Sequence, residues 1–247
     1  LSRALQRDAY ALVSDADMAE RRVLAEQLGE RLPTFTEEEV ALVKGSNDFY
    51  GMNHYTANYI KHRKGTPPED DFLGNLETLF YDKNGNCIGP ETQSFWLRPN
   101  AQGFRNLLNW LSKRYNYPKI YVTENGTSLK GESDLPLEQA LEDDFRCKYF
   151  HDYVHAMAKA VEEDGVNVKG YMAWSLLDNF EWADGYVTRF GVTYVDYKDN
   201  CKRYPKKSAR QMKPLFDSLI KKAEVEAAEA AKPAPAVAEE QAEEADA

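Results

Sequence analysis

Residues 119–126 read KIYVTENG, a short β-rich run that ends in a carboxylic acid and a turn dipeptide. Isoleucine, tyrosine, valine and threonine are typical of strands, and Asn125-Gly126 indicates a turn. The segment therefore predicts a strand that delivers Glu124 at its C-terminal end. Barrel enzymes hold their catalytic groups at that end of their parallel strands, so Glu124 is the first candidate for chemistry.

Strands and helices alternate around this segment. Residues 48–53 (DFYGMN) and 168–175 (VKGYMAWS) are also predicted strands. Caps and apolar side chains spaced three or four apart predict helices over residues 36–44, 103–114, 137–163 and 206–222. This order predicts parallel βαβ units in an α/β fold. A whole barrel needs eight strands, so three strands of this kind indicate a segment of a (β/α)8 TIM barrel.

Two other strand ends carry side chains suited to a polyol ligand. Residues 174–182, WSLLDNFEW, combine aromatic faces with carboxylate and amide groups. Asn53-His54-Tyr55 closes the first strand, where the phenol of Tyr55 could donate a hydrogen bond to a neighbouring carboxylate. Each also has an ordinary interpretation: Glu124 at an exposed turn, tryptophans that fill the rim of the core, and a strand-end tyrosine in water. Taken one by one, these alternatives stay open.

Five segments, taken in order, resemble glycoside hydrolase family 1 and look close to its fungal β-glucosidases. They are DFYGMNHYT (48–56), YVTENG (121–126), WSLLDNFEWADGY (174–186), RFGVTYVDY (189–197) and RYPKKSA (203–209). The similarity covers roughly residues 32–220 and implies the C-terminal part of the family's barrel. It implies a retaining β-glucosidase, which hydrolyses terminal β-glucosyl residues of β-glucosides and cello-oligosaccharides and needs no metal or organic cofactor.

The resemblance also implies roles for individual residues. Glu124 matches the nucleophile that attacks the anomeric carbon, and Tyr55 matches the tyrosine that hydrogen-bonds it. The side chains implied to bind the substrate are Asn53 in the same pocket, Trp174 beneath the sugar, Glu181 and Trp182 at its outer hydroxyls, and Phe190 as a wall.

Half of the expected chemistry is missing from the sequence. Retaining hydrolysis uses two carboxyl groups about 5–5.5 Å apart, a nucleophile and an acid/base. The family's acid/base lies in an Asn-Glu-Pro motif, which this sequence lacks, so the N-terminal half of the barrel is an expected partner. The alternatives are a non-catalytic sugar-binding or interaction protein, and a truncated chain without stable function. Upstream sequence containing Asn-Glu-Pro would favour the enzyme.

Charge and cysteine content exclude other classes. The net charge is −10, of which residues 223–247 carry −7, so the remaining −3 gives no reason to expect a nucleic-acid partner. The sequence has no apolar run long enough for a membrane span and no signal-peptide core. Three widely spaced cysteines indicate neither a disulfide framework nor a zinc site. His151 and His155 lack the glutamate of an HExxH motif, so we expect no metal. The odd number of cysteines and the missing signal-peptide core favour a reducing compartment, so we expect a cytoplasmic location.

Composition divides the chain into three parts. Residues 1–31 are charged, rich in alanine and a poor match to the family, and Leu1 need not be the true start. Residues 32–222 form the barrel part, in which residues 61–95 are predicted as a long loop. The acidic Ala/Glu/Pro tail, residues 223–247, is predicted to be disordered or loosely helical, because it buries too little apolar area to offset the entropy of ordering.

Overall fold

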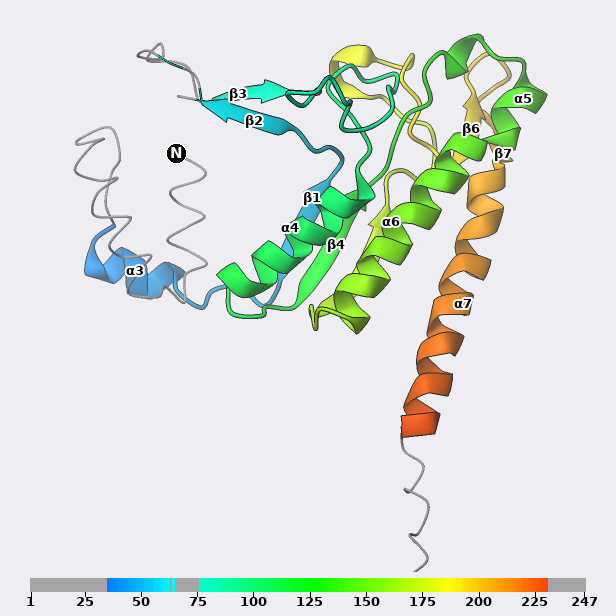
Figure 1. Cartoon of the computed structure of the whole chain (residues 1–247). Coiled ribbons are helices and arrows are strands. Elements are labelled where there is room, and N and C mark those ends of the chain that lie inside the picture. The colour runs from blue at the N-terminus through cyan, green and yellow to red at the C-terminus, as the bar shows by residue number, and fades with distance from the viewer. Residues whose placement is uncertain (1–34, 63, 65–75, 231–247) are drawn as a thin grey trace, which may run out of the picture.

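The computed structural model describes residues 35–62, 64 and 76–230 of the chain. Its centre is a parallel sheet with the strand order β1-β4-β5 (Figure 1). The strands are β1 (Tyr50–His54), β4 (Ile120–Asn125) and β5 (Val168–Ala173). They are the three predicted strands, and helices connect them as a parallel sheet requires.

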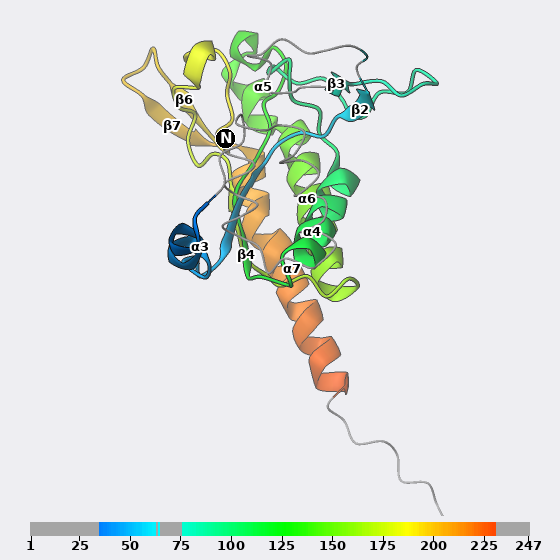
Figure 2. The same ribbon diagram turned by 90° about the vertical axis from the view of Figure 1, so that its left-hand side faces the viewer.

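Three helices pack on one face of this sheet (Figure 2). They are α4 (Ala101–Arg114), α6 (Asp144–Glu162) and α7 (Lys207–Ala230). The apolar stripe of α4 buries Phe104 and Leu108 completely, against Val122 of β4 and Tyr153 of α6. This core is built from residues four apart on the helix and two apart on the strands. It holds the sheet in a fixed position relative to the helices.

The helix predicted over residues 137–163 is broken in two. The pieces are α5 (Leu137–Glu142) and α6, and Asp143 between them adopts the left-handed conformation, with φ 44° and ψ 38°. The carboxylate of Asp143 accepts hydrogen bonds from Arg146 and Ser208. These buried partners account for a break that the four-residue spacing of apolar side chains did not predict.

The last helix is longer than predicted. It was expected to end at residue 222, but α7 continues to Ala230 and includes Pro214. Alanine and glutamate are strong helix formers, so the start of the predicted tail extends the helix. The rest of the tail, residues 231–247, and the N-terminal segment, residues 1–31, lie outside the described residues.

Two hairpins and several short elements complete the described structure. The first hairpin, β2 (Tyr59–His62) with β3 (Leu76–Leu79), gives part of the predicted long loop regular structure. The second, β6 (Thr193–Asp196) with β7 (Lys202–Pro205), follows the loop of residues 174–192 that leaves β5. The short helices are α3 (Glu37–Val43), η2 (Glu132–Asp134) and η3 (Trp182–Asp184). The capping box of Thr36 and Glu39 confirms the predicted start of α3.

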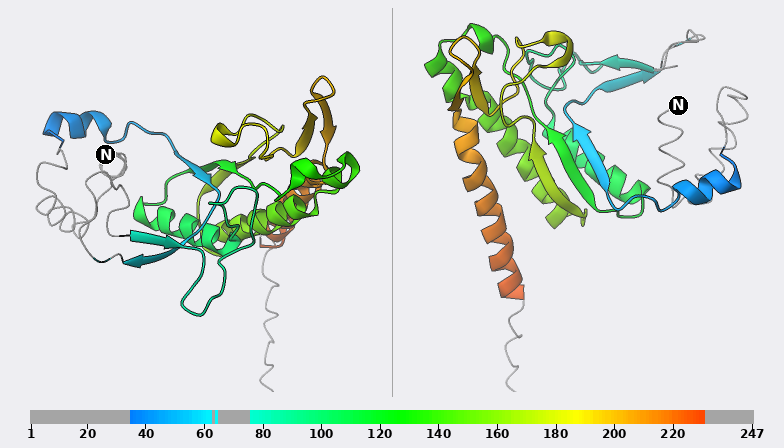
Figure 3. Two further views of the ribbon diagram at one scale, coloured as in Figure 1. Left: turned by 90° about the horizontal axis from the view of Figure 1, so that it is seen from above. Right: turned by 180° about the vertical axis from the view of Figure 1, so that it is seen from behind.

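The sheet does not close into a barrel within the described residues, because β1 and β5 are both edge strands (Figure 3). On the face away from the helices, Phe49 is 47% exposed and Met172 is 52% exposed. Unpaired parallel edges beside exposed apolar side chains are a surface that can accept further strands. None of the described helices is long and apolar enough to cross a membrane.

Candidate active site

The C-terminal ends of adjacent strands place three of the candidate side chains. Asn53 of β1 pairs with Glu124 of β4, and Asn125 pairs with Ala173 of β5, one residue before Trp174. The strands are parallel, so these ends meet at one edge of the sheet. Between the pairs Met52–Val122 and Asn53–Glu124 the register shifts, so Thr123 of β4 is an extra residue. An irregularity of this kind re-aims side chains beside active sites.

Tyr55 holds the carboxylate of Glu124. The hydroxyl of Tyr55 donates a hydrogen bond to Oε2 of Glu124, with an oxygen–oxygen distance of 2.5 Å. Burial raises the pKa of Tyr55 far above its usual value, and the carboxylates of Glu124 and Glu181 raise it further. The phenol therefore stays protonated and acts as the donor to the carboxylate of Glu124.

Glu181 is a second carboxylate, close enough to Glu124 for their charges to interact. Burial raises its pKa, and the negative charge of Glu124 adds to that effect. Hydrogen bonds from the side chains of Trp174 and Asn179 act in the opposite direction, and the amide nitrogen of Asn179 lies 3.2 Å from Oε2 of Glu181. Trp174 is thus linked to Glu181, and the charges of Glu181 and Glu124 act on each other.

Aromatic rings enclose the Tyr55 side of the site. Phe190 is only 1% exposed, and its ring meets that of Tyr55 edge to face at 5.9 Å between centroids. The ring of Trp96 also meets that of Tyr55 edge to face, at 6.0 Å between centroids. The structure thus brings Tyr55, Glu124 and Phe190 together. Trp96 was missed by sequence reasoning, because it lies in a polar loop outside the motif segments and has no local signal.

Two candidates stand apart from this group. Trp182 is 84% exposed at the start of η3, and no other aromatic ring in the described part of the chain packs against it. Asn53 is exposed, and its Oδ1 accepts a hydrogen bond of 2.6 Å from the hydroxyl of Thr123. Trp182 follows Glu181 and Asn53 lies two residues before Tyr55 in the sequence, but neither forms a hydrogen bond with Glu124 among the described residues.

The dipeptide Asn125-Gly126 is not the exposed turn that its sequence indicated. Asn125 is the last residue of β4 and is fully buried. Its amide donates to the carbonyl of His54 and to the hydroxyl of Tyr149, and its Oδ1 accepts from Tyr171 at 2.6 Å. The residue after the candidate nucleophile is therefore anchored in the core, which rules out a solvated turn at Glu124.

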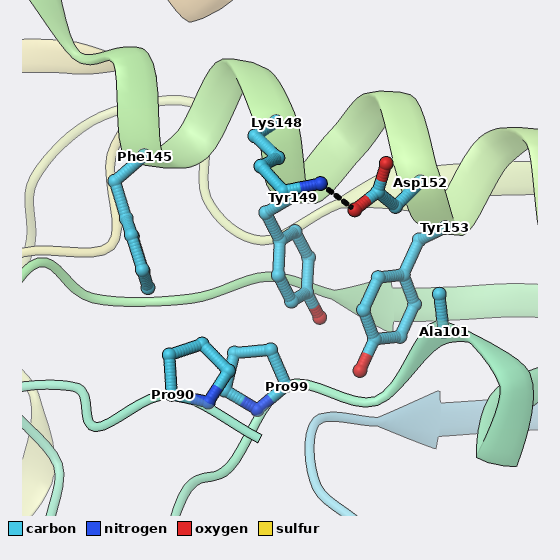
Figure 4. A pocket seen from close by; sticks show the side chains of 8 residues that line it. All are labelled: Pro90, Pro99, Ala101, Phe145, Lys148, Tyr149, Asp152 and Tyr153. Atoms are coloured by element: carbon cyan, nitrogen blue, oxygen red, sulfur yellow. Dashed lines mark hydrogen bonds and ion pairs between the residues drawn. The ribbon is translucent and has the colours of Figure 1, made fainter.

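A separate hollow of about 120 Å³ lies on the outer side, between α6 and the loop that leads into α4 (Figure 4). The rings of Phe145, Tyr149 and Tyr153 point from α6 towards Pro90 and Pro99. Its lining contains none of the predicted site residues. We therefore place the candidate site at the strand ends, where the carboxylates lie.

The described residues contain no group of three or more His, Cys, Asp or Glu side chains arranged to hold a metal ion. His151 and His155 stack on the surface of α6, with 4.1 Å between ring centroids, and Nδ1 of His155 faces the carbonyl of His151. The two histidines thus have the contacts expected on a solvated helix face.

A carboxylate at the end of a parallel strand, bound by a tyrosine and flanked by a second carboxylate and aromatic rings, is an arrangement suited to glycosyl transfer. Fold and site together define part of a (β/α)8 barrel with two carboxylates at the C-terminal ends of its strands. The chain belongs to glycosyl hydrolase family 1, whose model matches residues 10–224.

Relatives in sequence and structure agree with this assignment. Beta-glucosidase 1B of Phanerodontia chrysosporium is 53% identical over 211 residues, which are 85% of this chain and 38% of that protein. The crystal structure of a family 1 β-glucosidase from Humicola insolens in complex with glucose matches with a TM-score of 0.77 and 82% identity, over 79% of this chain and 41% of that one. Beta-glucosidase 2 of Trichoderma reesei in complex with Tris gives 0.77 and 72%, over 80% and 42%. The chain thus spans about two fifths of these relatives' length.

Proposed function

We propose that this chain carries the nucleophile half of a retaining β-glucosidase active site. The observation that carries the proposal is the hydrogen bond from Tyr55 to Glu124 at the C-terminal end of β4. The names of the fungal relatives supply the substrate class, β-glucosides. Cello-oligosaccharides with a terminal β-glucosyl unit are included in that class.

In the first step, a carboxylate oxygen of Glu124 attacks the anomeric carbon of the sugar. The bond between that carbon and the glycosidic oxygen breaks, and the oxygen leaves with the electron pair. The donated hydrogen bond of Tyr55 orients the attacking carboxylate. Water then cleaves the glycosyl-enzyme ester and regenerates Glu124.

The sugar would be held by the loop that follows β5. We assign Trp174 to the apolar face of the glucosyl ring and the carboxylate of Glu181 to its hydroxyls, since the two side chains are joined by a hydrogen bond. Phe190 closes the wall beside Tyr55. Trp182 and Asn53 complete the binding set; their exposure in this chain leaves them accessible to a ligand.

The acid/base must come from elsewhere in the barrel. Glu181 is occupied by Trp174 and Asn179, so it is poorly placed to protonate a leaving group. The open edges of β1 and β5 and the exposed side chains Phe49 and Met172 favour an N-terminal barrel half as the partner. We assign residues 32–222 to the barrel, with residues 1–31 and 223–247 as flanking segments.

We also propose a reducing compartment, such as the cytoplasm. Cys87, Cys147 and Cys201 all carry free thiols, and Cys87 and Cys201 are exposed. Exposed thiols persist most readily where disulfides are kept reduced.

The leaving-group dependence of the reaction tests the proposed function. Dinitrophenolate leaves without a proton, so the chain should release one equivalent from a dinitrophenyl β-glucoside in a burst. Turnover should then be slow, because no general base activates water, and azide should accelerate it. Cellobiose, whose leaving group needs general acid help worth about 10²–10⁴-fold, should react far more slowly. A missing burst, with Glu124→Gln as the blank, would refute the nucleophile half and leave the two alternatives, a non-catalytic sugar-binding or interaction protein and a truncated chain without stable function.

A further inference from the structure

A cluster of six charged side chains lies buried behind the site loops. It comprises three acids and three bases: Glu132, Asp143, Asp178, Arg146, Arg189 and Lys206. The side chains of Arg146, Glu132 and Lys206 are all 0% exposed. The nitrogen of Lys206 lies 2.5 Å from Glu132 and 3.2 Å from Asp178. The cluster is electrically balanced, and its members come from five separate segments of the chain.

Arg146 stands at the centre of the cluster and reaches two of the site segments. Its Nε donates a hydrogen bond of 3.1 Å to the carbonyl of Thr127, three residues beyond Glu124. One of its terminal nitrogens donates to the carbonyl of Arg189, the residue before Phe190. A single planar guanidinium therefore joins the segment that leaves the nucleophile strand to the segment that ends the sugar-binding loop.

Asp178 ties the middle of that loop to the same cluster. It lies between Trp174 and Glu181, and its carboxylate accepts from Arg189 at 2.5 Å and from the backbone N–H of Gly191 at 3.0 Å. The loop that follows β5 is therefore bonded to the buried cluster at two places, Asp178 and Arg189. The hydrogen bonds of Arg146 and Asp178 join the loop that carries Trp174 and Glu181 to the segment that follows Glu124.

We propose that the cluster centred on Arg146 is a positioning device that sets the spacing between Glu124 and the sugar-binding loop. The proposal rests on the proposed function of that site. Stability alone is a weak explanation for six buried charges, because replacing a buried ion network by apolar groups is often neutral or stabilising. A planar fork with several fixed donors is suited to holding two backbone segments in register.

Fluorine NMR of the chain grown with 5-fluorotryptophan tests this proposal without requiring any reaction. The four tryptophans are Trp96, Trp110, Trp174 and Trp182. Trp110 packs against Tyr115 near the end of α4 and serves as an internal reference. Arg146→Lys keeps the charge but loses the fork, so the Trp174 signal should shift while that of Trp110 stays in place. The matched control is Arg105→Lys, because Arg105 forms a comparable fork with Asp164 and Glu163 between α4 and the end of α6.

A second variant covers the case in which Arg146→Lys does not fold. Arg146→Met combined with Glu132→Gln removes one positive and one negative charge, so the cluster stays balanced. It should also shift Trp174 and slow the dinitrophenolate burst by roughly 10²-fold, the loss expected from a displacement of about 1 Å. An unmoved Trp174 signal in a folded variant, or loss of all four signals in both variants, would overturn the proposal. If the wild type itself gives no burst, the proposed function fails, while the NMR comparison still decides the positioning role.

Discussion

At the scale of single residues, the hydrogen bond between Tyr55 and Glu124 carries the most chemical information. It is 2.5 Å long and partly buried, and it joins the ends of two neighbouring strands at the carboxylate proposed to react. Motif order identified both residues from the sequence. Trp96 and the six-charge cluster could not be found that way, because burial of a charged side chain leaves no local pattern and its partners lie far along the chain.

Tyr55→Phe should slow the dinitrophenolate burst by about 10- to 100-fold. A hydrogen bond to a charged group contributes roughly 1.5–3 kcal/mol, and each 1.36 kcal/mol is tenfold in rate. Stopped-flow absorbance of the released phenolate measures the change. Tyr81→Phe is the control, because Tyr81 is 53% exposed and lies outside the site. Equal burst rates for Tyr55→Phe and the wild type would remove Tyr55 from the reaction.

Binding of the sugar should weaken at low pH through protonation of Glu181. Burial raises the pKa of this acid above its usual 4.5. Its carboxylate is therefore lost earlier, as pH falls, than an ordinary glutamate's. As the pH falls and Glu181 becomes protonated, the concentration of dinitrophenyl β-glucoside that gives half of the maximal burst rate should rise. Trp174→Phe removes a hydrogen bond that lowers this pKa, so it should move the transition to higher pH. A transition that persists unchanged in Glu181→Gln would refute the assignment.

At the scale of elements, strand ends do most of the positioning. The three strands and α4 could be predicted, because strand residues alternate and Phe104, Leu108 and Leu111 follow a helical spacing. The left-handed break at Asp143 could not be predicted, since one of its partners, Ser208, lies 65 residues away. Tertiary contacts of that kind override local propensity.

His54 at the end of β1 should make the fold sensitive to acid. Burial against Phe104 and Tyr153 lowers the pKa of His54 from 6.5 to about 4. Below pH 6.5 His54 becomes protonated in the unfolded chain but stays neutral in the folded chain. The free energy of unfolding therefore decreases as the pH falls from 6.5 to about 4. At 1.36 kcal/mol per pKa unit the loss is about 3 kcal/mol. Urea unfolding at pH 7 and at pH 4 should show this extra loss in the wild type but not in His54→Phe; equal losses in both would contradict it.

Gly126→Ala should disrupt the junction between β4 and β5. A Cβ at this position would lie 1.8 Å from the carbonyl oxygen of Trp174, so one of the strand ends must move. We expect the burst rate to fall by about 10²-fold. Gly51→Ala on β1 is the matched control, because its Cβ would meet Thr123 at an ordinary 3.6 Å. A Gly126→Ala burst as fast as that of Gly51→Ala would contradict the close approach.

At the scale of the whole molecule, the number of parallel strands agrees with the fraction of its relatives' length that the chain covers. Three parallel strands are three eighths of a closed barrel, and the chain covers 38% to 42% of the fungal relatives. The number of strands and the missing Asn-Glu-Pro motif already indicated a partial barrel. Which surfaces this leaves open, such as Phe49 and Met172, depends on the sheet order and could be learned only from the structure.

The most direct measurement is the intact mass of the chain after incubation with dinitrophenyl 2-deoxy-2-fluoro-β-glucoside. This reagent needs a nucleophile and a formed sugar pocket but no general acid, and the fluorine slows hydrolysis of the ester so that it accumulates. We predict a single added fluoroglucosyl group, which peptide mapping places on Glu124 and which Glu124→Gln abolishes. An unmodified chain, beside a full-length family 1 β-glucosidase labelled in parallel, would contradict a working nucleophile half, as would a label on any other residue.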